Sequence, residues 1–129
     1  MIRKKNIYRF QTSEDLLIYG DIFQHATREE IEALDAETVD IANINISNEE
    51  IKTTLIGEHN RNDIRAAVRA CIGFGLTKSE CLAAVEDFHG LPHRLEYVGE
   101  FKGIKFYNDS IATAQEAVIR AVQALGNVN

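Results

Sequence analysis

The chain has 129 residues, 45% of them hydrophobic and 26% charged, with a formal net charge of -6 and a single proline. This length allows one domain, or the end of one and the start of another, and the composition supplies a packed core rather than a disordered tail. The acidic balance excludes a general nucleic-acid binder, and no apolar run approaches the ~20 residues that cross a bilayer. Cys71 and Cys81 match no zinc or redox spacing and are expected to be small buried side chains. We therefore expect a monomeric, cytoplasmic globular protein with no nucleic-acid or membrane partner.

The first third of the chain predicts short strands around one short helix. Residues 6–10 and 16–19 are rich in β-branched and aromatic side chains and flank a polar turn, which predicts a β-hairpin. Thr27 is suited to cap a helix whose first turn carries glutamates and which should end near Leu34. Residues 38–46 alternate imperfectly between apolar and polar side chains and predict one or two short strands.

Two longer helices are predicted in the middle of the chain. Apolar residues recur at three- and four-residue steps from Asn62 to Gly73, which is the period of one helical face. Thr77 and Glu80 have the spacing of a capping box at the start of a second helix, and the Gly90-Leu91-Pro92 segment must end it.

The last third predicts another hairpin and a final helix. Residues 94–99 and 104–107 have strand composition around Lys102-Gly103, and after Ser110 the pattern is helical up to Leu125. The predicted fold class is α/β, in the sense of an α+β fragment with short β-hairpins and two to four helices.

Two polar segments lie where a strand leads into a helix or a turn, positions at which side chains can face a ligand. Gly57-Glu58-His59-Asn60 precedes the first long helix, and on local grounds Asn60 or Asn62 caps that helix. Residues 88–96 read Phe-His-Gly-Leu-Pro-His-Arg-Leu-Glu and place Arg94 just before the second hairpin. Its guanidinium is always charged and offers a planar fork of donors, which suits phosphate or ribose oxygens.

A third polar segment, residues 108–113, reads Asn-Asp-Ser-Ile-Ala-Thr and follows the second hairpin directly. On a structural interpretation, Asp109 and Ser110 cap the last helix, and Arg94 forms an ion pair with Asp109 or Glu96.

Taken in order, the three segments resemble the Mur ligase family, and in particular its D-glutamate-adding members. The family carries Gly-x-His-Asn before an alanine-rich helix, then Phe-x-Gly-Leu-Pro-His-Arg-x-Glu, and Asn-Asp-Ser-x-Ala-Thr marks the D-glutamate adders. The resemblance covers roughly residues 55–125. It implies that residues 1–108 are the C-terminal part of the family's central ATP-binding domain and that residues 109–129 begin its C-terminal ligand-binding domain.

The resemblance also implies which side chains contact ligands. Asn60 would lie beside the adenine of ATP, Arg94 would contact nucleotide oxygens, and Asp109 would accept hydrogen bonds from the ribose. Thr113 would help to hold the incoming D-glutamate. We expect no catalytic residue and no metal ligand in this chain.

Two positions depart from the family pattern. Asp63 stands where the pattern has a second asparagine, and a carboxylate can accept from the adenine amino group but cannot donate to a ring nitrogen. Ile111 stands where many members have a lysine, so a contact assigned to that lysine cannot be carried over. The family's phosphate loop, magnesium ligands and modified lysine have no match in this sequence.

These features predict a fragment, inactive alone, of a ligase that uses ATP and magnesium to add D-glutamate to UDP-N-acetylmuramoyl-L-alanine in peptidoglycan (cell-wall) biosynthesis. In that family, ATP phosphorylates the substrate carboxylate and the D-glutamate amine attacks the acyl phosphate. A ligase that adds another amino acid, or extends folate with glutamate, fits residues 108–113 less well. The alternative from another class is a small non-catalytic module that binds a nucleotide or a protein partner. A phosphate loop encoded upstream in the same frame supports the ligase, whereas a true start codon at Met1 supports the module.

Overall fold

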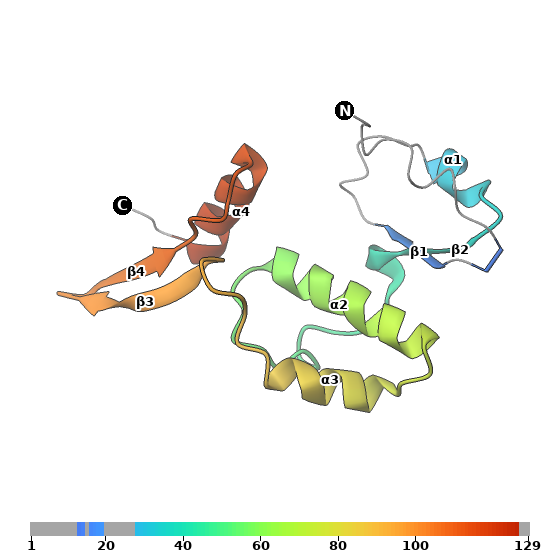
Figure 1. Cartoon of the computed structure of the whole chain (residues 1–129), viewed down its shortest axis with the longest axis horizontal. Helices are drawn as coiled ribbons and strands as arrows, with labels where there is room; N and C mark the ends of the chain where they lie inside the picture. Colours follow the sequence, from blue (N-terminus) through green and yellow to red (C-terminus); the bar gives the residue numbers. More distant parts are fainter. Residues whose placement is uncertain (1–12, 15, 20–27, 127–129) are drawn as a thin grey trace.

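The computed structural model describes residues 13–14, 16–19 and 28–126 (Figure 1). Within these ranges the chain is mixed α/β, with four α-helices and two two-stranded sheets. The predicted fold class is therefore confirmed.

Two short strands near the start of the chain pair in parallel. β1 (Leu16–Tyr19) and β2 (Glu37–Asp40) run in register from Leu16 opposite Glu37 to Tyr19 opposite Asp40. The predicted strand at 16–19 is confirmed, and its partner in the structure is β2. The hairpin partner predicted at 6–10 lies outside the described residues.

The segment between these strands contains α1 (Arg28–Glu32). Its predicted cap, Thr27, lies outside the described residues. The Leu34 amide donates to the carbonyl of Ile31, a 3₁₀-type bond that tightens the last turn close to the predicted end.

Only the beginning of the predicted strand region 38–46 is a strand. After β2, the Asp40 carboxylate accepts a hydrogen bond from the Ala42 amide at 2.9 Å and caps the 3₁₀ helix η2 (Ile41–Asn43). This local side-chain bond offers the backbone an alternative to a sheet ladder, so the chain leaves the sheet there.

The long helix α2 (Glu58–Gly73) begins four residues before the predicted start at Asn62. Gly57 is its N-cap and makes no side-chain capping bond, so the prediction that Asn60 or Asn62 caps the helix is wrong. Asn60 instead donates from Nδ2 to the carbonyl of Ile56 at 2.7 Å. The free amides of the first turn are therefore left without a capping side chain.

The next helix, α3 (Lys78–Glu86), has the predicted capping box. The Glu80 amide donates to Thr77 Oγ1 at 3.2 Å, and the Thr77 amide donates to Glu80 Oε2 at 2.9 Å. Cys81 on α3 is buried as predicted, whereas Cys71 in the last turn of α2 is exposed, so the prediction for Cys71 is wrong.

The core lies between α2, α3 and the loop that precedes α2. Two isoleucines of that loop are buried as completely as the side chains of the helices, each contributing ~1.5–3 kcal/mol by leaving water. The buried cluster consists of Ile46, Ile51, Ile64, Val68 and Cys81, with Ile44, Leu55, Leu82 and Val85 packed against it.

Two arginines of α2 attach this loop to the helix. Arg65, whose side chain is 11% exposed, donates to the carbonyl of Ile46 at 3.0 Å, to Asn48 Oδ1 at 2.5 Å and to Glu58 Oε1 at 2.8 Å. Arg61 donates to the carbonyl of Asn48 at 3.1 Å. Because buried carbonyls need partners, these bonds allow an irregular segment to pack into the core.

The second predicted hairpin is confirmed. β3 (Glu96–Phe101) and β4 (Ile104–Asn108) pair antiparallel, with an irregularity between Tyr97 and Gly99. Lys102 and Gly103 both have positive φ (51° and 80°), as the tight turns favoured in hairpins require.

The last helix, α4 (Gln115–Leu125), is confirmed at the predicted place, but its start differs. Ala114 is its N-cap and no side chain caps it, so the interpretation of Asp109 and Ser110 as caps of this helix is wrong. The amide of Ala112 instead donates to the carbonyl of Asp109, which makes a turn between β4 and α4.

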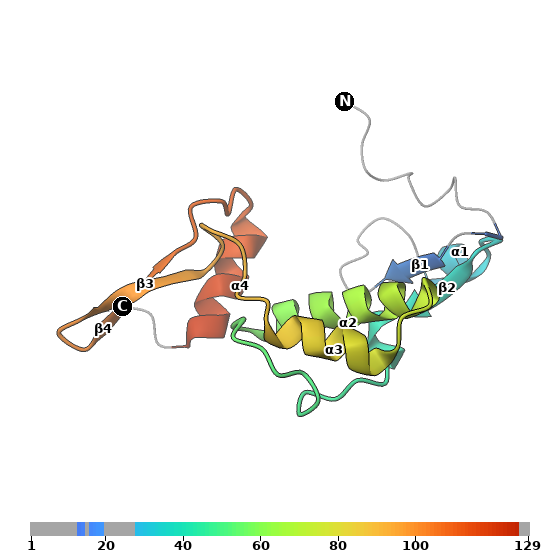
Figure 2. The same ribbon diagram turned by 60° about the horizontal axis from the view of Figure 1, so that its bottom comes forward.

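The elements form two parts side by side (Figures 1 and 2). In one part α2 packs against α3 and β1 lies against α2. In the other, the β3–β4 hairpin lies beside α4, beyond the N-terminal end of α2. None of the helices in the described part of the chain is long and apolar enough to cross a membrane.

The Glu58–Arg65 contact predicts a pH dependence of stability. The hydrogen bond from Arg65, and then the one from Asn48, lowers the pKa of Glu58 below its ordinary value of 4.5. Its stabilising contribution is therefore present above that ordinary value and lost as the pH falls through the lower, folded-state value.

We expect Glu58→Gln to flatten the fall in the free energy of unfolding below pH 5, by less than about 1 kcal/mol because the pair is partly exposed. Urea denaturation at several pH values measures this. Glu100→Gln, an exposed glutamate on β3, is the matched control, and an equal flattening in both variants would contradict the assignment.

Candidate functional site

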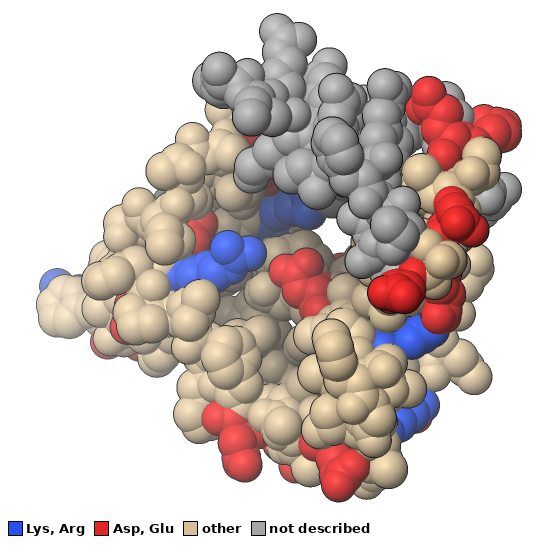
Figure 3. All heavy atoms as spheres, turned by 45° about the vertical axis from the view of Figure 1, so that its right-hand side comes forward, with Lys and Arg blue, Asp and Glu red and all other residues tan. Residues whose placement is uncertain are grey.

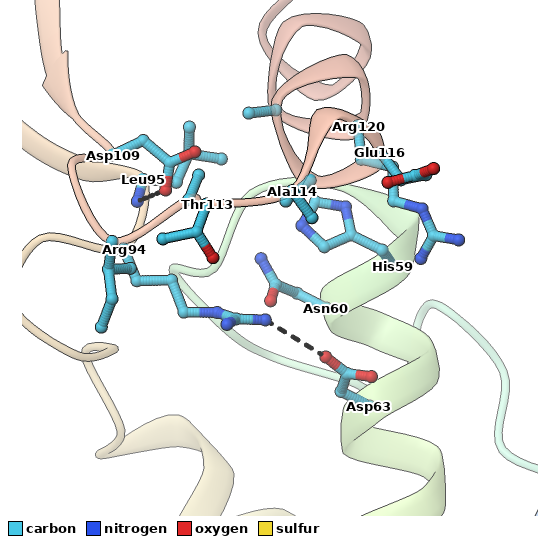
Figure 4. A pocket seen from close by; sticks show the side chains of 14 residues that line it. His59, Asn60, Asp63, Arg94, Leu95, Asp109, Thr113, Ala114, Glu116 and Arg120 are labelled. Atoms are coloured by element: carbon cyan, nitrogen blue, oxygen red, sulfur yellow. Dashed lines mark hydrogen bonds and ion pairs between the residues drawn. The ribbon is translucent and has the colours of Figure 1, made fainter. Parts of the chain in front are cut away.

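A cavity of about 470 Å³ lies between α2, the turn before β3, and the segment that leads into α4. This volume is within the ~300–1,000 Å³ of small-molecule sites. All four side chains that the sequence predicted as ligand contacts line it: Asn60, Arg94, Asp109 and Thr113. Figure 4 shows Asn60 coming from α2 and the other three from the opposite wall. The structure thus brings three separate sequence segments to one place.

The cavity has both polar and apolar walls. Small apolar side chains at 111–121 form much of one wall, including Ala112, Ala114 and Ala117. Figure 3 shows a hollow in one face of the molecule with basic and acidic side chains on either side of it.

Four further polar side chains line the cavity: His59, Asp63, Glu116 and Arg120. Two guanidinium groups and three carboxylates line the cavity in all, which gives it a formal charge of -1 with the histidine neutral. His59 and Asp63 lie within the family motif that begins at Gly57, whereas no motif of the sequence pointed to Glu116 or Arg120.

Asn60 reaches the cavity with part of its amide already engaged. Its Nδ2 donates one hydrogen bond to the carbonyl of Ile56 at 2.7 Å. An amide has two N–H groups and a carbonyl oxygen, so one donor and the acceptor remain for a ligand.

Arg94 projects from a strained turn. Its neighbours His93 and Leu95 have φ values of 64° and 48°. For residues with a Cβ this left-handed conformation costs roughly 1–2 kcal/mol each. Such residues persist only where the surrounding structure holds them in place.

The 108–113 segment provides that support. Asp109 Oδ1 accepts the Leu95 amide at 2.9 Å, and the His93 carbonyl accepts the Ile111 amide at 3.2 Å. The Asn108 amide is 2.8 Å from His93 Nδ1. The segment 108–113 therefore holds the turn that carries Arg94 of the segment 88–96. Sequence reasoning missed this role. Because one oxygen of Asp109 holds Leu95, the second oxygen is the one left to face the cavity.

The ion-pair partner of Arg94 is Asp63 on α2, with Nη2 4.0 Å from Oδ2 (Figure 4). The structural interpretation, in which Arg94 pairs with Glu96 or Asp109, is wrong in its choice of partner. The two side chains are 56% and 70% exposed, so solvent screens the pair and it contributes little to stability.

The end of α4 comes close to the start of α2 at Gly57. A Cβ added to Gly57 would lie 2.7 Å from the Cβ of Ala124 and 2.7 Å from the ring of His59. Gly57 also has φ of 98°, which residues with a side chain rarely adopt. Only glycine allows the end of α4 to approach this closely.

Metal ligands do not cluster in the part of the chain that the structure describes: no three His, Cys, Asp or Glu side chains there are placed to hold an ion. His93 is within hydrogen-bonding distance of Asn108 and 3.9 Å from the carboxylate of Glu96.

Comparison with known proteins shows similarity to one enzyme class. The chain is 44% identical over 73 residues to a UDP-N-acetylmuramoylalanine--D-glutamate ligase of Oleidesulfovibrio alaskensis, which is 57% of this chain and 16% of that protein. Ligases of the same name from Caldicellulosiruptor bescii (39% over 71 residues, 55% of this chain and 16% of that protein) and Enterococcus hirae (47% over 57 residues, 44% and 12%) are also similar. No protein-family model matches the chain. The predicted resemblance is confirmed, and this chain spans about 16% of the length of the first of these relatives.

The close approach at Gly57 generates a prediction about the cavity. Gly57→Ala should push α4 away from α2, because the new methyl group cannot share the space of Ala124, and should also strain the backbone. We expect the free energy of unfolding to fall by roughly 2–4 kcal/mol and contacts between residues 57 and 124 to disappear from NOE spectra.

Gly75→Ala is the matched control, since Gly75 has φ of 92° but nothing lies within 4 Å of an added Cβ. It should show only the backbone strain, with the contacts between residues 57 and 124 retained. Equal losses of stability in both variants, with those contacts intact, would refute the steric explanation.

Proposed function

We propose that this chain is part of a cytoplasmic, ATP-dependent ligase that joins D-glutamate to UDP-N-acetylmuramoyl-L-alanine in peptidoglycan biosynthesis, and that its cavity receives the nucleoside end of ATP. The observation that carries the proposal is that the side chains of three separate motif segments line one cavity. The similarity of about half the chain to D-glutamate ligases supports the same assignment. We keep the predicted division, with residues 1–108 in the central ATP-binding domain and 109–129 in the C-terminal domain.

Each motif side chain has a role that its remaining hydrogen-bonding groups allow. The free amide groups of Asn60 face the edge of the adenine, and the second oxygen of Asp109 accepts from a ribose hydroxyl. Arg94 donates to ribose or phosphate oxygens. Thr113, on the loop between Asp109 and α4, helps to hold D-glutamate.

The contribution of this part of the ligase is orientation. In phosphoryl transfer, positioning of the nucleotide and neutralisation of its charge supply most of the catalysis. No magnesium site is assigned to the described residues of this chain, and the phosphate loop and magnesium ligands are assigned to other parts of the ligase. The chain alone is therefore proposed to bind without turnover.

One observation favours the alternative, a non-catalytic module. The cavity carries a formal charge of -1, whereas sites for polyphosphates are usually basic. Such a module would bind an uncharged nucleoside or a protein segment. A phosphate loop encoded upstream in the same reading frame separates the ligase from the module.

In the full-length ligase, Arg94→Ala and Asp109→Ala should each raise the Michaelis constant for ATP by roughly 10- to 150-fold, because each removes a charge-assisted hydrogen bond worth ~1.5–3 kcal/mol. Steady-state kinetics with varied ATP measures this. Asp109→Asn is the matched control, since its carbonyl oxygen can still accept the Leu95 amide and keep the turn. An unchanged constant in both alanine variants would remove these residues from the site.

The isolated chain should bind ATP with a dissociation constant in the millimolar range, on the order of 4 kcal/mol of binding free energy, because the phosphate contacts are elsewhere. Isothermal titration calorimetry measures the affinity. Micromolar binding would show that the chain holds a complete nucleotide site and would contradict its assignment as a fragment.

A further inference from the structure

We propose that Asp63 determines ligand specificity in this cavity: its carboxylate holds the guanidinium of Arg94 and competes with the phosphate of an incoming nucleotide. The cavity then favours the uncharged nucleoside over its phosphorylated forms more than it would with a neutral residue at 63. This inference rests on the proposed nucleotide site and adds a selectivity to it.

Asp63 lies near both Asn60, which we assign to the adenine, and Arg94, which we assign to ribose or phosphate oxygens. Asp63 follows Asn60 by one helical turn on α2, and both line the cavity. Figure 4 shows the Arg94 side chain reaching across from the opposite wall, with its end directed at the Asp63 carboxylate. The pair at 4.0 Å therefore spans the cavity.

A carboxylate at this distance acts on a phosphate in two ways. Its negative charge attracts the Arg94 guanidinium and so competes with the phosphate for that cation, and the same charge repels the phosphate directly. The other lining arginine, Arg120, lies on α4 next to Glu116 in Figure 4, away from Arg94. A phosphate at Arg94 therefore lies close to the Asp63 carboxylate and has no second lining arginine beside it.

The exposure of the pair limits the size of the effect. Pairs with both side chains more than half exposed interact weakly, so releasing Arg94 should change phosphate affinity by roughly two- to fivefold. A neutral ligand does not compete with Asp63 for Arg94, so the change in affinity should be confined to phosphorylated ligands.

The test uses the whole 129-residue chain and two probes, adenosine and AMP, titrated while amide chemical shifts of the cavity residues are followed. The quantity compared is the ratio of the dissociation constant of AMP to that of adenosine. Asp63→Asn is expected to lower this ratio roughly two- to fivefold through tighter AMP binding, with the adenosine constant changed less than the AMP constant.

Two controls separate the ion pair from general electrostatics. Glu116→Gln removes one negative charge from the same cavity without releasing Arg94, and should change the ratio less than Asp63→Asn does. In an Arg94→Gln background, Asp63→Asn should change the ratio less than it does with Arg94 present, because only the direct repulsion of the phosphate remains to be removed.

The outcomes distinguish the two proposals. If adenosine shifts no cavity residue in any variant, the nucleotide site itself is wrong and this inference falls with it. If adenosine binds but Asp63→Asn leaves the ratio unchanged, or matches Glu116→Gln, only the role of Asp63 is overturned.

Discussion

The cavity depends on the hydrogen bond from the Leu95 amide to the Asp109 carboxylate. It holds Leu95 in a left-handed conformation that a branched side chain adopts at a cost, and the adjacent Arg94 is aimed by that conformation. On the other side of the arginine, the His93 carbonyl accepts the Ile111 amide, and the His93 ring is within hydrogen-bonding distance of the Asn108 amide. The carboxylate thus has two uses, one oxygen for the fold and one for a ligand. A residue of this kind links the stability of the turn to occupancy of the site, because whatever binds the free oxygen also orders the turn.

The other wall of the cavity is held by different interactions. α2 carries Asn60 and Asp63, and its rigidity comes from the loop packed against it, whose carbonyls are bonded by Arg61 and Arg65. Desolvation of a guanidinium is costly unless its donors are satisfied, and Arg65 meets that condition with four acceptors from the loop and α2. At the start of α2, Gly57 leaves room for the end of α4 to approach. The site therefore has two unlike walls. One is α2, which packs on a hydrophobic core, and the other is the turn that carries Arg94, which packs on almost no buried apolar side chains.

Local sequence signals predicted the parts of this arrangement that local interactions decide. The capping box at Thr77, the hairpin turn at Lys102 and the last helix all follow from residues close in sequence. The features that were not predicted depend on distant partners. The parallel pairing of β1 with β2 and the contact of Asp63 with Arg94 join segments whose proximity no periodicity encodes. The start of α2 was misplaced because an asparagine near a helix start suggests a cap, whereas Asn60 bonds backward to Ile56 from within the helix.

The weakness of the second part of the chain bears on how the site works. An isolated two-stranded hairpin is at best marginally stable, and here it leaves Phe101, Ile104 and Phe106 exposed. On α4 only Ala121 is buried, while Val118 and Ile119 face solvent. Segments with little buried apolar area open locally at low free-energy cost, so the wall that carries Arg94 and Asp109 should open more readily than α2. The apparent affinity of a ligand is reduced by the fraction of molecules in which its site is formed. Covering these apolar faces would therefore tighten binding of the proposed nucleotide without adding a single contact to it.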